Sequence, residues 1–210
     1  MSKIKQLDDL ELAALVSSRI CHDVVGPVGA IFNGLEVLED DDDEQVQKYA
    51  MDVIRRNTKN AWARLEFARL AFGAAGSAGA EIPFNKIQDL SNAILEEKHK
   101  IDWSSEHDFL PKGYAKVILN LVVIAVTSIP RGGKINLSIT GEMERPTITM
   151  ISRGNGARLP ERVPEILSGE YEGEIDALVI QPYYTYRLIT ANDFKINVKP
   201  GEDEMKFTLN

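Results

Sequence analysis

The sequence predicts two parts of different class, an antiparallel helical hairpin followed by an α/β sandwich. Apolar residues recur at alternating three-residue and four-residue intervals through residues 7–39 and again through 44–72, the pattern of two long amphipathic helices. Residues 73–80 are small and uncharged, as in a flexible linker. Beyond them, short alternating stretches are interleaved with helical ones. We expect residues 1–73 to form a helical domain and residues 81–210 a second domain.

The first helix is expected to span residues 7–39. Its apolar seam has coiled-coil spacing and consists of Leu7, Leu10, Ala14, Ser17, Cys21, Val24, Val28, Ile31, Leu35 and Leu38. Cys21 is predicted to be a small buried member of this seam, and a single cysteine excludes an internal disulfide and fits a reducing compartment. Residues 39–44 are all acidic and are interpreted as a solvated turn that favours the start of the next helix, with a metal site as the alternative.

The second helix carries a comparable apolar stripe. Its members are Met51, Ile54, Thr58, Ala61, Leu65, Ala68 and Phe72, widened by Val46, Ala50 and Val53. A hairpin with two such stripes cannot bury them alone, so we expect a homodimer in which two hairpins form a four-helix bundle. The competing solution is that the second domain covers the stripes within one chain.

The second domain is expected to be a mixed sheet with helices on one face. The predicted strands are residues 81–84, 101–106, 135–139, 148–150, 194–198 and 205–209. The predicted helices are residues 87–95, a buried helix after Lys112, residues 161–167, and residues 174–191 with a break or kink at Pro182.

Composition narrows the possible functions. The chain has 210 residues, 44% of them hydrophobic, and a net charge of −8, so it can bury a core but carries no basic cluster for nucleic acid. The N-terminus has no apolar run of signal-peptide length. The longest apolar run, residues 117–126, is about half the length of a membrane span. We therefore expect a cytoplasmic protein that contacts neither nucleic acid nor membrane.

His22 is the residue on which a functional prediction depends. It lies just off the seam and shares a helix side with Ser18, Arg19, Gly26 and Gly29. The two glycines each cost a helix about 1 kcal/mol, which close approach by another backbone would explain. Pro27 is predicted to kink the helix. An exposed imidazole can act as a nucleophile, and the alternative is an ordinary surface histidine. The pattern His-acid-x-x-x-Pro resembles the phosphoacceptor box of the dimerisation (DHp) domain of histidine kinases.

The second domain resembles the Bergerat-type ATPase domain of the same kinases, in degenerate form. Residues 117–125 resemble the N-box helix, in which two asparagines face the nucleotide and magnesium; Asn120 matches the first, and Ile124 replaces the second. Residues 152–156 resemble the Asp-x-Gly-x-Gly loop without its acidic residue, and residues 175–191 lack the glycine pair that holds phosphates. This comparison implies that no ATP is bound. Asn120 is then predicted to be a structural residue with buried hydrogen-bond partners.

The helical motif is similar to that of the ChpT-type histidine phosphotransferases of alphaproteobacteria. The matching run is His22-Asp23-x-x-Gly26-Pro27-x-Gly29-Ala30-Ile31-x-Asn33-Gly34-Leu35-Glu36, with a weaker match at residues 130–133. The resemblance implies a dimeric phosphorelay intermediate that takes a phosphoryl group from a receiver domain, such as that of a hybrid histidine kinase, and passes it to the receiver of a response regulator. It implies no cofactor, because the partner receiver supplies magnesium.

The expected roles fall on one side of the first helix. His22 is the predicted phosphoacceptor, Asp23 orients its ring or raises its basicity, and the predicted docking residues are Arg19, Val25, Gly26, Gly29 and Asn33. Weaker docking candidates are Arg55, Arg56 and Lys59, and His99 and His107 are interpreted as surface residues. Two other functions remain open: a non-catalytic dimeric scaffold that sequesters receivers, and a divergent ATP-dependent kinase.

Overall fold

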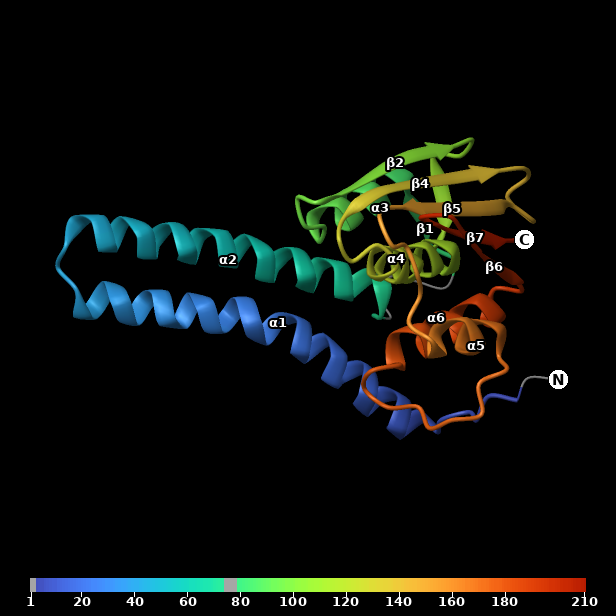
Figure 1. The fold of residues 1–210 in the computed structure, drawn as a ribbon, viewed down its shortest axis with the longest axis horizontal. Coiled ribbons are helices and arrows are strands. Elements are labelled where there is room, and N and C mark those ends of the chain that lie inside the picture. Colours follow the sequence, from blue (N-terminus) through green and yellow to red (C-terminus); the bar gives the residue numbers. More distant parts are fainter. Residues whose placement is uncertain (1–2, 74–78) are drawn as a thin grey trace.

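The computed structural model describes residues 3–73 and 79–210, and its helical hairpin projects from the α/β part (Figure 1). The hairpin consists of α1 (Asp9–Asp40) and α2 (Glu44–Ala71). Asp8 caps α1 through a capping box with Glu11, and Asp43 caps α2 through the backbone N–H groups of Gln45 and Val46. The predicted role of the acidic turn at the start of the second helix is thereby confirmed. Most of the predicted linker, residues 74–78, lies outside the described residues.

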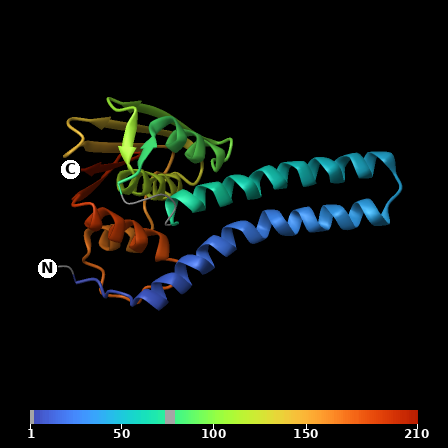
Figure 2. The ribbon, with the colours of Figure 1, turned by 180° about the vertical axis from the view of Figure 1, so that it is seen from behind.

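α1 is one continuous helix that contains Pro27. Both ribbon views show it bending along its length, so that its first turns diverge from α2 and approach α6 (Figures 1 and 2). A proline inside a helix removes the backbone hydrogen bond to the carbonyl four residues earlier, here that of Asp23, and favours such a bend.

The predicted seam of α1 is divided between two faces. Pro27 and Gly34 are buried against α2, and Ile31 and Leu38 are half-buried, whereas Val28 and Leu35 stay 49% and 47% exposed. Cys21 is exposed, so the prediction that it is buried is wrong for the single chain. The reason is a rotation of the helix: the more buried positions Ile20, Asp23, Pro27 and Gly34 each lie one residue before a predicted seam position. One residue corresponds to about 100° around the helix axis, which turns Cys21, Val28 and Leu35 out of the hairpin contact.

The α/β part contains a five-stranded mixed sheet of order β2-β4-β5-β7-β6. Its strands are β2 (His99–Ser105), β4 (Gly133–Thr140), β5 (Thr147–Arg153), β6 (Ile196–Gly201) and β7 (Glu204–Leu209). β2 runs parallel to β4, and the other neighbours are antiparallel. A separate antiparallel pair joins β1 (Glu81–Pro83) to β3 (Phe109–Pro111). The sequence predicted β1, but neither β3 nor its pairing with β1.

The helices of this part are α3 (Phe84–Ala93), α4 (Lys112–Thr127), α5 (Arg162–Ser168) and α6 (Ile180–Ala191). α4 is the predicted buried helix, and most of its residues from Ala115 to Ala125 are inaccessible to solvent. The predicted start of the last helix, residue 174, is wrong. Because α6 begins at Ile180, Pro182 lies in its first turn, where a missing N–H removes no helical hydrogen bond.

The prediction that His99 is a surface residue is wrong, because His99 is only 6% exposed. It is the first residue of β2, and its ring Nε2 lies 3.1 Å from the carbonyl oxygen of Ile129. His107 is half-buried, and its Nε2 lies 2.8 Å from the carbonyl oxygen of Gly141.

Both ends of the hairpin are packed into the α/β part. Phe67, Leu70 and Ala71, at the end of α2, belong to the main core cluster with residues of α4. Ile4, just before α1, packs in a second cluster with residues of α5 and α6, and the hydroxyl of Tyr183 accepts a hydrogen bond from the backbone N–H of Leu7. The α/β part thus packs on the base of the hairpin, where Leu10 is nevertheless exposed, and a longer exposed apolar stretch lies farther out at Val25, Val28, Phe32 and Leu35. Within the described residues, none of the helices combines the length and apolar content that crossing a bilayer requires.

Candidate functional site

His22 lies in the middle of α1 with 82% of its side chain exposed. Successive residues of a helix are rotated by about 100°, so residues three, four, seven and eleven apart share a side. On that basis His22, Gly26, Gly29 and Asn33 line one side of α1, and the exposed apolar residues Val28 and Leu35 lie on another. His22 is therefore accessible on a side of the helix that faces neither α2 nor the exposed apolar residues.

Asp23 links His22 to Arg19. The Arg19 Nε donates a hydrogen bond to Oδ2 of Asp23 at 3.1 Å, and Oδ1 of Asp23 lies 3.4 Å from Nδ1 of His22. Arg19 and Asp23 are both largely buried, with side chains 30% and 28% exposed. With a proton on Nδ1, this contact is a hydrogen bond to the carboxylate, and the lone pair of the exposed ring then lies on Nε2.

The two glycines leave open space beside His22. A Cβ atom added at Gly26 or Gly29 would meet no heavy atom within 4 Å, whereas one added at Gly34 would lie 2.7 Å from Cγ1 of Ile54. Val25 is 69% exposed, and Asn33 is exposed. Four of the five predicted docking residues are thus exposed on α1, whereas Arg19 is half-buried and turned toward Asp23. Val25 lies between this side and the apolar face.

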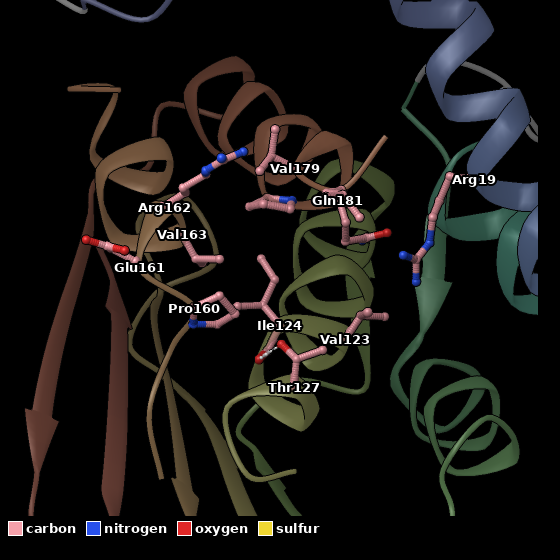
Figure 3. A pocket seen from close by; sticks show the side chains of 12 residues that line it. Arg19, Val123, Ile124, Thr127, Pro160, Glu161, Arg162, Val163, Val179 and Gln181 are labelled. Carbon is pink, nitrogen blue, oxygen red and sulfur yellow. Dashed lines mark hydrogen bonds between the residues drawn. The ribbon is translucent and has the colours of Figure 1, made fainter. Parts of the chain in front are cut away.

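Two cavities lie where the hairpin meets the α/β part, and Arg19 lines both. One, of about 360 Å³, lies between α4, α6 and the segment before α5 (Figure 3). The other, of about 240 Å³, reaches Asp23 and the end of α2. Glu96 lines the second cavity, and the hydrogen bond from Lys98 lowers the pKa of its carboxyl group. Gln181 lines both cavities and is the residue that sequence reasoning missed, because its partners are distant in the chain.

Asn120 is fully buried and has the hydrogen-bond partners that the sequence analysis required. Its Nδ2 donates to the carbonyl oxygens of Ala71 and Lys116 at 3.1 and 2.9 Å, and its Oδ1 accepts from Nε2 of Gln181 at 2.7 Å. One amide thereby joins α4 to the end of α2 and to α6. Nearby on α4, burial lowers the pKa of Lys116, with a smaller effect from Lys112. On α6, burial raises the pKa of Tyr184.

The loop that resembles the kinase Asp-x-Gly-x-Gly segment is occupied by contacts within the chain. Ser152 is fully buried, and a Cβ atom at Gly154 would lie 2.4 Å from the carbonyl oxygen of Gly132. The backbone N–H of Gly156 donates to Asp203 at 2.7 Å. Across residues 3–73 and 79–210, no group of three or more His, Cys, Asp or Glu side chains is arranged to hold a metal ion, the acidic turn included.

Comparison with known proteins assigns the chain to a family. The family described as "Histidine phosphotransferase C-terminal domain" matches residues 84–204. The protein phosphotransferase ChpT of Brucella abortus (strain 2308) is 39% identical over 210 residues, which are 99% of this chain and 99% of that protein. The chain belongs to the ChpT family of histidine phosphotransferases. It is therefore a phosphotransferase.

A solved structure agrees with this assignment to the ChpT family. It is described as "1.7 Angstrom Structure of a Bacterial Phosphotransferase", is 36% identical, covers 100% of both chains and superposes with a TM-score of 0.89. The Acinetobacter baumannii histidine kinase AdeS is more distant, at 11% identity and a TM-score of 0.45 over 90% of this chain and 95% of that one. The fold is an antiparallel helical hairpin joined to an α/β sandwich, as the sequence predicted.

Proposed function

We propose that His22 accepts a phosphoryl group from the aspartate of a receiver domain, such as that of a hybrid histidine kinase, and passes it to the aspartate of a response regulator. The observation that carries this proposal is the exposed His22 ring, whose Nδ1 faces Asp23 while Nε2 stays accessible. An accessible lone pair on an unprotonated ring nitrogen is what nucleophilic attack on phosphorus requires.

The transfer is an in-line displacement. Nε2 of His22 forms a bond to phosphorus as the bond from phosphorus to the aspartyl oxygen breaks, and the receiver's aspartate leaves as a carboxylate. The ring becomes an imidazolium, and Asp23 stabilises its Nδ1–H. The reverse displacement on a second receiver returns the phosphoryl group to an aspartate. This chain contributes the nucleophile, its orientation and the docking surface, and the partner receiver supplies magnesium.

The proposal includes no ATP-dependent step. The Asn120 amide is fully buried, its Nδ2 donates to Ala71 and Lys116, and its Oδ1 accepts from Gln181, which supports a structural role for the amide in place of magnesium binding. Ile124, which replaces the second asparagine of the kinase pattern, is buried and supplies no oxygen.

We also propose that the active form is a homodimer. α1 carries a row of exposed residues on one side: Cys21, Val25, Val28, Phe32 and Leu35. Trp62 and Leu65 are exposed on α2. Such a row exceeds the scattered apolar exposure that is usual on a monomer, and pairing with a second hairpin would bury it in a four-helix bundle.

Label transfer tests the role of His22. Purified protein is incubated without ATP with a panel of receiver domains phosphorylated on aspartate, and acid-labile label on the chain is measured. We expect label on the wild type and on His107→Ala, and none on His22→Ala. Magnesium and ATP in place of the receivers should give no label. Label on His22→Ala, or tight receiver binding with no label from any donor, would refute the proposal, and the latter would favour the scaffold.

The open space at Gly29 predicts opposite effects of one substitution on stability and on transfer. Gly29→Leu should raise the free energy of unfolding by about 0.5–1 kcal/mol, because leucine favours a helix and meets no neighbour. Phosphoryl transfer should slow by about tenfold or more, because the side chain fills the space beside His22. Gly34→Leu is the contrasting variant and should destabilise the hairpin through Ile54. An unchanged rate of phosphoryl transfer in Gly29→Leu would show that Gly29 is not part of the docking surface.

A further inference from the structure

The carboxylate of Asp23 faces His22 with one oxygen and Arg19 with the other. Oδ1 lies 3.4 Å from Nδ1 of His22, and Oδ2 accepts the hydrogen bond from Arg19 at 3.1 Å. The last torsion of an aspartate side chain is broad, so a carboxylate bonded only to His22 would rotate freely between orientations. Because the two oxygens are rigidly joined, a donor that fixes Oδ2 also fixes the direction in which Oδ1 accepts.

The helix alone does not account for this pair. An isolated i,i+4 ion pair on an exposed helix stabilises it by about 0.3–0.5 kcal/mol. The pair stabilises the helix more when the acidic residue precedes the basic one in the sequence. Here Arg19 precedes Asp23, and only 30% and 28% of the two side chains are exposed. Something outside α1 must therefore hold Arg19 in place.

The α/β part supplies that support. Arg19 lines both junction cavities, and so do Val123, Thr127 and Gln181 from α4 and α6. Figure 3 shows Arg19 on α1 facing the side of the pocket on which Val123 and Gln181 lie. Arg19 thus lies at the junction, half-buried between α1 and the cavities, while its Nε donates to Asp23.

We propose that Arg19 is a positioning residue for His22 that acts through Asp23. It fixes the carboxylate that keeps the proton on Nδ1 of His22 and the lone pair on Nε2. This proposal rests on the proposed role of His22 and assigns Arg19 a different task from the receiver contact predicted from the sequence. It also gives the degenerate α/β domain a part in the chemistry, because the walls of the junction hold Arg19.

The first test measures which ring nitrogen of His22 carries the proton in the free protein. Long-range proton–nitrogen NMR near pH 8, where histidines are neutral, reports the tautomer of each of the three histidines, and His22→Ala assigns the signal. We expect the Nδ1–H tautomer to dominate in the wild type and in Arg55→Met, an arginine paired with Asp52 on α2. Arg19→Met should raise the Nε2–H fraction, and Arg19→Lys should restore part of the wild-type signal. An unchanged tautomer in Arg19→Met would overturn the proposal.

The second test separates positioning from docking. With saturating phosphorylated receiver, Arg19→Met should slow transfer about threefold to tenfold while the receiver Kd stays within about twofold. Asp23→Asn should slow transfer by a similar or larger factor, and the double variant should be no slower than Asp23→Asn, because both act through one carboxylate. The proposal would be overturned if Arg19→Met bound the receiver more weakly but transferred at the wild-type rate at saturation. It would also be overturned if the rate losses of Arg19→Met and Asp23→Asn multiplied in the double variant. If the wild type itself takes up no label, the proposed function fails, and the tautomer measurement still tests Arg19.

Discussion

Replacing both Val28 and Leu35 with glutamate is expected to separate the protein into monomers that remain folded. Both side chains lie on the exposed apolar row of α1 and are about half exposed in the single chain, so the charges remain hydrated there. Glutamate also favours a helix. In a four-helix bundle each substitution occurs twice, and four carboxylates would replace apolar contacts worth about 1.5 kcal/mol or more each. We expect the dimer Kd to rise by at least about 10³-fold.

Sedimentation equilibrium measures this effect directly. The wild type should sediment at twice the 23.4 kDa mass of one chain, and the double variant at the mass of a single chain with unchanged circular dichroism. Val37→Glu is the matched control, because Val37 is an exposed valine of the same helix. It is rotated by about 180° around the helix axis from Val28, so it does not belong to the exposed apolar row. It should remain dimeric. A wild type that sediments as a monomer, or a double variant that stays dimeric, would refute the bundle.

Replacing Asn120 with leucine is expected to cost about 2–4 kcal/mol of folding free energy. Leucine has a similar volume but no polar atoms, so the carbonyl oxygen of Ala71 and the amide of Gln181 would each lose a partner. A buried polar group without a hydrogen bond costs about 1–3 kcal/mol. Urea unfolding followed by circular dichroism gives the difference.

Two comparisons make this measurement specific. Asn85→Leu changes the same residue type at an exposed position of α3 and should alter the free energy of unfolding by less than about 0.5 kcal/mol. In Asn120→Leu/Gln181→Leu both amides are replaced, so the double loss should be smaller than the sum of the single losses. A loss below about 1 kcal/mol in Asn120→Leu would show that the amide does not tie the hairpin to the α/β part.

Local patterns predicted the elements whose periodicity is long. The two hairpin helices, the buried α4 and the alternating strands β4 and β5 were all recognisable, because each presents several turns or residue pairs of one repeat. The three-residue strand β3 and the start of α6 were not, since each depends on partners elsewhere in the chain. The burial of His99 follows from the position of β2 beside β4, which no neighbouring residue specifies.

The same distinction applies to the candidate site. The exposure of His22 and its helix side followed from spacing alone. The sequence also showed that Asn120 needs hydrogen-bond partners, but Gln181 is 61 positions away and Ala71 is 49 away. The position of Arg19 at cavities lined also by residues of α4 and α6 is likewise a property of the assembled chain.

The hydrogen bonds of Asn120 bear on whether its amide could ever serve as a cation ligand. An asparagine at position 124 would complete the pair that the kinase pattern contains, yet Oδ1 of Asn120 accepts from Gln181, and its Nδ2 donates to Ala71 and Lys116. A cation at Oδ1 would have to enter a site that is closed to solvent and compete there with Gln181, which links α4 to α6. A substitution that gained a ligand at this position would therefore weaken the packing that holds the fold together.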